Sequence, residues 1–201
     1  MRHFRMRRMA KLSRLLNITE NIRILDVGGT PANWSLLPIE PKVTMLNMPR
    51  AMEADRHGMI WIFADGCHLP FADKSFDLVF SNSVIEHLGE PRRHEQFARE
   101  IARVGVRYFV QTPNRWFPVE HHLLTPLIHF LPRSWQRWII KRFTVWEWIA
   151  SPRPDQREYY LEHYLRDIRL LDAGRMRLLF PGARLIRERF LGLTKSLIAV
   201  R

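Results

Sequence analysis

Short apolar runs recur along the first 113 residues of this chain, and each is long enough for one buried strand. They lie at residues 22–28, 42–47, 59–65, 76–81 and 106–113. Continuous apolar runs of this length are typical of buried strands. A helix over residues 91–104 separates the last two, because Phe97, Ile101 and Val104 fall there at helical spacing. Strands that alternate with helices predict an α/β fold, a mainly parallel sheet with helices on both faces.

The C-terminal part of the chain adds a different pattern. Residues 160–180 predict another helix, which ends before Pro181 and Gly182. The segments ARLIRERFLG and KSLIAVR follow, and both predict strands with no helix between them. Two such strands favour an antiparallel pair at one edge of the sheet, which makes the expected sheet seven-stranded.

Residues 114–158 fit neither pattern. They are rich in Trp, Pro, His and Arg, and they directly follow the fifth strand. We expect a Trp/Arg-rich helical insertion here, which caps the ends of the strands. The length of 201 residues suits one domain over residues 1–201, with a basic helix at residues 1–20.

A strong positive charge narrows the range of partners. The chain has 32 Lys and Arg against 20 Asp and Glu, a formal net charge of +12. This excess favours anionic partners, namely nucleic acid, acidic lipid surfaces, or phosphorylated and carboxylated substrates. Cys67 is the only cysteine, so an intrachain disulfide is excluded.

The N-terminus is basic, but it lacks the apolar run and the cleavage site of a secretory signal. No stretch reaches the roughly 18 apolar residues that a bilayer span needs. We therefore expect a cytoplasmic protein, for which peripheral contact with an anionic membrane stays open.

The stretch ILDVGGTPANW, residues 24–34, joins the first strand to a glycine-rich turn. Gly28 and Gly29 let the backbone approach a ligand closely and expose N–H groups to it. In an open α/β sheet, ligands bind at the C-terminal ends of the strands. Asp26 stands at that end, where it either accepts hydrogen bonds from a ligand or caps a tight turn. A glycine motif alone does not separate these two interpretations.

A longer run of residues carries a family resemblance. Its members, in chain order, are Asp65, Leu69-Pro70-Phe71, Asp73, Ser75-Phe76-Asp77, Val79 and Glu86-His87-Leu88. This order resembles the class I S-adenosylmethionine-dependent methyltransferases, in particular the small single-domain group. The resemblance covers residues 22–114 and extends to the C-terminal helix and strand pair. It implies a Rossmann-like fold and S-adenosylmethionine as the cofactor.

The resemblance also implies cofactor contacts. In that family the first turn wraps the methionine part of the cofactor, and an acid after the second strand holds the ribose. The residues after the third strand reach the adenine, and the segment after the fourth strand lines the other side. Carried over to this sequence, the implied cofactor-binding residues are Asp26, Gly28, Gly29, Thr30, Asn47, Asp65, Gly66, Cys67, Ser81, Asn82 and Ser83.

Two departures from the family pattern bear on activity. Thr30 and Ala32 replace the later glycines of the usual turn, which stiffens it. Asn47 stands where the family has an acid, so the ribose loses a charge-assisted hydrogen bond, and a neutral bond is roughly half as strong. The alternative that follows is a weakened or inactive site in a non-catalytic, methyltransferase-like binding module.

Methyl transfer to oxygen or nitrogen requires that the acceptor also lose a proton. The candidate catalytic residues are His87, after the fourth strand, and Glu120 and His121, after the fifth, with His122 beside them. The alternative for His87 is a packing or capping role. No metal site is expected, because the adjacent His121 and His122 point in different directions and no third ligand has suitable spacing.

The insertion places aromatic rings among basic residues, and its aromatic members include Trp135, Trp138, Phe143, Trp146 and Trp148. Three interpretations stay open: a lid over the substrate, a membrane-interface surface, and a nucleic-acid surface with stacking rings. No RRM or KH signature is present, which disfavours nucleic acid. The leading expectation is a methyltransferase that acts on a small-molecule or lipid-like acceptor, of unknown oligomeric state. The alternatives are the binding module and an RNA methyltransferase.

Overall fold

The computed structural model describes residues 2–48, 59–142 and 144–201, so Phe143 of the aromatic segment lies outside the described residues. The strands are β1 (Arg23–Val27), β2 (Lys42–Asn47), β3 (Ile60–Phe63), β4 (Phe76–Asn82), β5 (Gly105–Pro113), β6 (Arg184–Phe190) and β7 (Leu193–Val200). Within the described residues they form one seven-stranded sheet in the order β3-β2-β1-β4-β5-β7-β6.

The first five strands run parallel, and β7 runs antiparallel to both β5 and β6. The mainly parallel sheet and its C-terminal antiparallel pair confirm the predicted fold class. Parallel pairing places the C-terminal ends of β1 to β4 at the same edge of the sheet, where a ligand site is expected.

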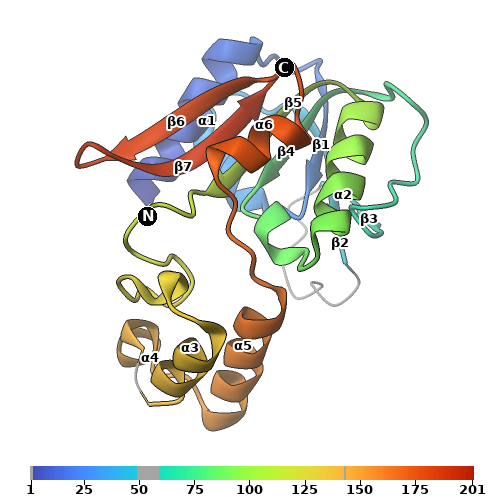
Figure 1. Ribbon diagram of the computed structural model, residues 1–201. Coiled ribbons are helices and arrows are strands. Elements are labelled where there is room, and N and C mark those ends of the chain that lie inside the picture. Colours follow the sequence, from blue (N-terminus) through green and yellow to red (C-terminus); the bar gives the residue numbers. More distant parts are fainter. Residues whose placement is uncertain (1, 49–58, 143) are drawn as a thin grey trace.

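Helices cover both faces of the sheet (Figure 1). On one face α1 (Arg2–Leu16) and the short helix η1 (Pro31–Leu36) bury Leu12 and Trp34 against the strands. On the other face α2 (Pro91–Val104) and α6 (Ala173–Leu179) bury Phe97 and Met176. Strand β4 lies between two neighbouring strands, and the side chains of its centre, such as Phe80, are fully buried. Burial on both faces explains why this strand has a continuous apolar sequence.

The insertion after β5 forms a small helical layer beyond the C-terminal ends of the strands (Figure 1). It contains η4 (Ile128–Phe130), α3 (Arg133–Ile140) and α4 (Val145–Ala150), and α5 (Pro154–Asp167) follows. These helices share a core of their own, made by Leu123, Ile128, Ile140, Leu161, Tyr164 and Ile168. The layer therefore has its own apolar core and stands over the edge of the sheet where the strand ends converge.

The helix predicted over residues 160–180 is two helices, α5 and α6, with an extended link between them. In that link the backbone N–H of Arg169 donates to the carbonyl oxygen of Glu86 at 2.8 Å. Asp172 then caps α6, since its carboxylate accepts from the backbone N–H of Arg175 at 2.8 Å. An uninterrupted helix could make neither bond, so tertiary contact and capping override the helical pattern.

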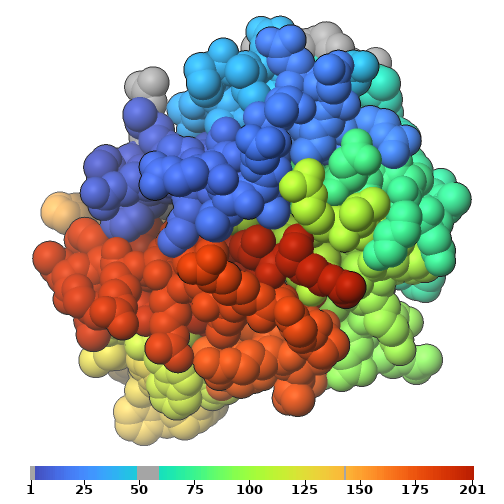
Figure 2. Space-filling view, turned by 90° about the horizontal axis from the view of Figure 1, so that it is seen from above, coloured from blue at the N-terminus to red at the C-terminus, as the bar shows by residue number. Residues whose placement is uncertain are grey.

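Helix α1 lies across the molecule beside the C-terminal strands (Figure 2). The helix ends at Leu16, four residues before the predicted boundary, and Asn17 has a positive φ of 47°. No helix in the described part of the chain combines the length and the apolar composition that crossing a bilayer requires.

Candidate functional site

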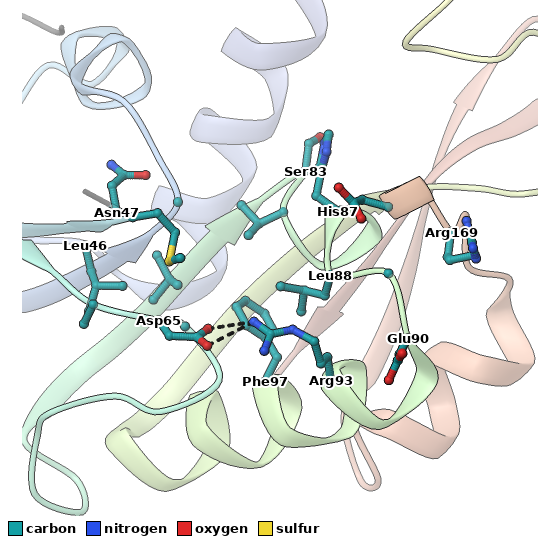
Figure 3. Close-up of a pocket in the computed structure, with 18 of the residues that line it drawn as sticks. Leu46, Asn47, Asp65, Ser83, His87, Leu88, Glu90, Arg93, Phe97 and Arg169 are labelled. Carbon is teal, nitrogen blue, oxygen red and sulfur yellow. Dashed lines mark hydrogen bonds and ion pairs between the residues drawn. The ribbon is translucent and has the colours of Figure 1, made fainter. Parts of the chain in front are cut away.

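A cavity of about 900 Å³ opens where β1, β2, β3 and β4 end, and α2 and the end of α5 complete its wall (Figure 3). This volume lies within the range of ordinary ligand sites, roughly 300–1,000 Å³. The sequence-predicted residues that line it are Gly28, Asn47, Asp65, Gly66, Ser83 and His87. Residues from four separate segments are thus brought to one cavity.

The first turn leaves no room for side chains. Gly28 has a φ of +75°, and a Cβ there would lie 2.6 Å from Cγ2 of Val84. A Cβ on Gly29 would collide with the carboxyl group of Asp26. Only glycine fits both positions, because the first needs left-handed backbone and both lie against other groups.

Asp26 lies beneath this turn and is not part of the cavity lining. Its side chain is fully buried, and Nε1 of Trp34 donates to Oδ2 at 2.8 Å. Its Oδ1 has no hydrogen-bond partner among the described residues. Burial raises the pKa of Asp26 to about 7, although the bond from Trp34 opposes the rise. The carboxyl group therefore supports the turn from below.

Asn47 makes a bond that an acid could not make. Its side-chain Nδ2 donates to the carbonyl oxygen of Gly29 at 3.0 Å, which ties the end of β2 to the glycine turn. A carboxylate at this position would place charge against that carbonyl oxygen. The departure from the family pattern thus has a structural reason in this chain.

Asp65 faces the cavity from the end of β3 and is held from α2 (Figure 3). Nη2 of Arg93 donates to both of its carboxylate oxygens at 3.0 Å, and the backbone N–H of Cys67 donates to Oδ1 at 2.9 Å. Partial burial alone would raise the pKa of Asp65, but the bonds from Cys67 and Arg93 outweigh it and lower that pKa. Asp65 is therefore a fixed, ionised acceptor at the cavity wall.

Other predicted residues lie behind the wall. The Cys67 thiol is buried, which raises its pKa to about 11, so it is not a reactive thiolate. Ser81 donates from Oγ to the carbonyl oxygen of Val27 at 3.0 Å, and Asn82 accepts from Arg8 of α1. Thr30 precedes η1 and does not line the cavity. The side chains of Ser81 and Asn82 thus tie β4 to β1 and to α1.

A second polar group lies where the insertion meets the cavity. Glu120 is fully buried, and its Oε1 lies 2.6 Å from Nδ1 of His122. Nε2 of His122 lies 3.2 Å from Nε2 of His87, on the cavity wall. Burial would lower the pKa of His122, but the adjacent Glu120 carboxylate outweighs burial and raises this pKa. For His87, burial and the nearby His122 both lower the pKa, to about 4. His121 points elsewhere, with its ring 5.5 Å from that of Phe117.

The structure also shows wall residues that the sequence did not single out. The charged ones are Glu90, which directly precedes α2, Arg93 of α2, and Arg166, Asp167 and Arg169 around the end of α5. Arg93 gives no signal in the sequence, because its contact with Asp65 spans 28 residues and depends on how α2 packs. Glu86 belonged to the family motif, but only the structure shows that it is fully buried beside His122.

The comparison with protein families decides the class of this site. Residues 24–106 match the family model described as a methyltransferase domain. This stretch is a methyltransferase domain. Over residues 24–106 the match confirms the methyltransferase family that the sequence resembles, and S-adenosylmethionine is the cofactor of that family.

Relatives outside the family model agree with this assignment. The chain is 31% identical over 96 residues to an uncharacterized methyltransferase of Mycolicibacterium gilvum, covering 43% of this chain and 37% of that protein. A second uncharacterized methyltransferase, from Mycolicibacterium vanbaalenii, is 31% identical over 93 residues, covering 42% of this chain and 36% of that protein. The chain thus spans little more than a third of the length of these relatives.

Two solved structures share the fold over nearly the whole chain. A protein of Pyrococcus horikoshii has a TM-score of 0.54 at 18% identity, covering 96% of this chain and 88% of that one. A SAM-dependent methyltransferase of Aquifex aeolicus has a TM-score of 0.50 at 14% identity, covering 96% of this chain and 87% of that one. The methyltransferase domain therefore sits in a chain whose sheet and helices follow a known arrangement.

Proposed function

We propose that this chain is an S-adenosylmethionine-dependent methyltransferase whose cofactor binds in the cavity at the ends of β1 to β4. The observation that carries the proposal is the convergence of Gly28, Asn47 and Asp65 on that one cavity. Bound there, S-adenosylmethionine supplies a methyl group on a sulfonium, and the protein aligns the acceptor behind it.

The residues present fit such a ligand. Gly28 lets the backbone approach the amino acid end of the cofactor, and Asp65 offers carboxylate lone pairs to an adenine amino group. Oδ2 of Asp65 can accept a further bond besides that from Arg93, whereas Oδ1 already accepts from both Arg93 and the backbone N–H of Cys67. Asn47 uses its Nδ2 on Gly29, so its amide oxygen is left for a ribose hydroxyl.

For removal of the acceptor proton, we propose the polar group around His87. Its lowered pKa keeps the imidazole neutral at pH 7, which is the state that a general base needs. Glu120 acts through His122, which it holds against His87. His121, the third candidate from the sequence, is not among the residues that line the cavity.

The acceptor is proposed to carry an acidic group. A second cavity of about 530 Å³ lies beside the first and is lined by Arg115, Arg133 and Arg169, with Arg169 belonging to both. No acidic residue is among the described residues that line it. Three guanidinium groups without a lining carboxylate suit a phosphate or carboxylate of a small-molecule or lipid-like acceptor.

Calorimetry with S-adenosylmethionine tests the proposed function. The protein should bind the cofactor, and Asp65→Ala should weaken that binding at least tenfold. The control is Asp73→Ala, which removes an exposed aspartate that pairs with Arg103 outside the cavity. Absence of binding at millimolar cofactor, or equal effects of the two variants, would contradict the proposal. When the protein is incubated with cell extract and radiolabelled cofactor, it should then give a labelled product that an anion exchanger retains.

A further inference from the structure

Three potential metal ligands from two distant segments meet beside the cofactor cavity. Glu86 and His87 come from the short helix η3 (Ile85–His87) after β4, and His122 comes from the insertion. One ligand atom of each residue lies within 4.8 Å of those of the other two. His87 also lines the cavity, so the cluster lies at its wall.

The two histidines face one another through the same ring atom. Their Nε2 atoms are 3.2 Å apart. Zinc binds histidine nitrogen at about 2.0–2.1 Å, so two such ligands in a tetrahedral site lie about 3.3–3.4 Å apart. The observed separation therefore suits one shared cation, although a hydrogen bond between the rings has a similar length.

Glu86 supplies the observation that points to a ligand. Its side chain is fully buried, and Oε2 accepts from Oγ1 of Thr112 at 3.0 Å. Oε1 has no hydrogen-bond partner among the described residues, and the group belongs to the same cluster as the two rings. A buried carboxylate oxygen without a partner is costly, and a cation bound in the cluster would satisfy it.

The surroundings of His122 resemble those of a metal ligand. Glu120 lies 2.6 Å from Nδ1, and its other oxygen accepts from the backbone N–H groups of His122 and Leu123 at 2.7 Å. A carboxylate on one ring nitrogen fixes the tautomer and directs the lone pair of the other nitrogen to the metal. Here that other nitrogen is Nε2, which faces His87.

We propose that Glu86, His87 and His122 bind a divalent transition-metal ion, with zinc as the first candidate. Two histidines and one glutamate are a ligand set of catalytic zinc sites, which keep a fourth position open. The sequence argued against a metal because His121 and His122 are adjacent, but the partners of His122 come from the segment after β4. Given the proposed function, a cation here would bind the acceptor oxygen and lower its pKa, so that its proton would pass to water and His87 would act as a ligand in place of the base. Metal binding itself does not depend on that function.

The test is titration of chelator-treated protein with ZnCl₂ in a calorimeter. One equivalent should bind with micromolar or tighter affinity. His122→Ala and Glu86→Gln should each weaken binding at least a hundredfold, and Glu120→Gln about 10–100-fold because it only orients a ligand. The matched control is His121→Ala, which removes the neighbouring histidine outside the cluster and should leave affinity unchanged. Circular dichroism establishes that each variant is folded, and Glu86→Gln keeps the size of the side chain.

Two results would overturn the proposal. One is wild-type protein that binds no zinc at 100-fold excess over protein, and the other is equal zinc affinity in wild type and both ligand variants. S-adenosylmethionine binding is measured on the same samples, so the two proposals fail separately. If the protein binds the cofactor but no zinc, the metal proposal is wrong and His87 and His122 are simply hydrogen-bonded to each other. If it binds zinc but no cofactor, only the methyltransferase proposal is wrong.

Discussion

At the scale of single residues, the raised pKa of Asp26 predicts the direction in which the stability of the fold changes with pH. Its pKa is about 7 in the fold and 3.8 in an exposed carboxyl group, so the folded state binds more protons between these values. The stability that this group contributes is full below pH 3.8 and is lost as the pH rises through 7. Asp26→Asn removes the titration and keeps an acceptor for Trp34. Between pH 5 and pH 8, the unfolding free energy of the Asp26→Asn variant should therefore rise by about 2–3 kcal/mol relative to that of the wild type.

Urea denaturation at pH 5 and pH 8 measures this difference. Glu86 and the buried histidines titrate in the same pH range, but they are present in both proteins and cancel in the comparison. Parallel pH dependence of the two proteins would show that Asp26 is ionised in the fold at a normal pKa. The position of Asp26 could be predicted from the strand and the glycines. Its role beneath the turn could not, because it depends on Trp34 and on the close approach of Gly29.

At the scale of elements, one arginine holds α1 against the sheet. Nη2 of Arg8 donates to Oε2 of Glu188 in β6 at 2.6 Å, and Nη1 donates to Oε1 of Gln111 in β5 at 3.0 Å and to Asn82 in β4. The side chains of Arg8 and Glu188 are only 9% and 12% exposed. Arg8→Met should lower the unfolding free energy by about 3–5 kcal/mol, because it leaves a nearly buried carboxylate unpaired.

A double-mutant cycle separates the ion pair from the packing of α1. Adding Glu188→Met to Arg8→Met should restore most of the lost stability in urea unfolding, because neither charge then stays buried alone. Arg7→Met is the neighbouring control, an exposed residue whose loss should change stability by less than about 0.5 kcal/mol. If Arg7→Met lowers the unfolding free energy as much as Arg8→Met does, the loss comes from removing positive charge from α1 and not from breaking the ion pair with Glu188.

The same helix shows where prediction of elements from sequence stops. Apolar spacing in α1 indicated a helix with a basic surface, and the burial of Leu12 agrees with that pattern. Nothing in the sequence distinguishes Arg8 from its exposed neighbours, since its partners lie 74 to 180 residues away. Strands β1 and β4 could be predicted for the opposite reason, because both faces of each strand are buried and its sequence is therefore nearly continuously apolar. The break between α5 and α6 was missed because Glu86, far away in the chain, provides the acceptor that opens the helix.

At the scale of the whole molecule, aromatic rings and positive charge meet on the insertion. Trp135 and Trp138 on α3 and Trp148 on α4 are 64%, 59% and 80% exposed. The guanidinium of Arg142 lies 4.1 Å from the ring centre of Trp138. Exposed tryptophans beside basic residues suit the interface of an anionic membrane, where the rings enter the headgroup region. The insertion lies beyond the C-terminal ends of the strands (Figure 1), so a membrane bound there would face the edge at which the two cavities open.

We therefore expect the protein to float with vesicles that contain phosphatidylserine at 50 mM salt, and to float weakly with neutral phosphatidylcholine vesicles. Binding should fall at 500 mM salt, because screening weakens the attraction of the basic residues. Replacing Trp135, Trp138 and Trp148 by alanine should abolish flotation. Replacing Leu178 and Leu191, which are 75% and 85% exposed outside the insertion, should leave flotation unchanged. Equal loss in both variants would indicate nonspecific adhesion, whereas no flotation by the wild type would leave the tryptophans as part of a lid over the acceptor.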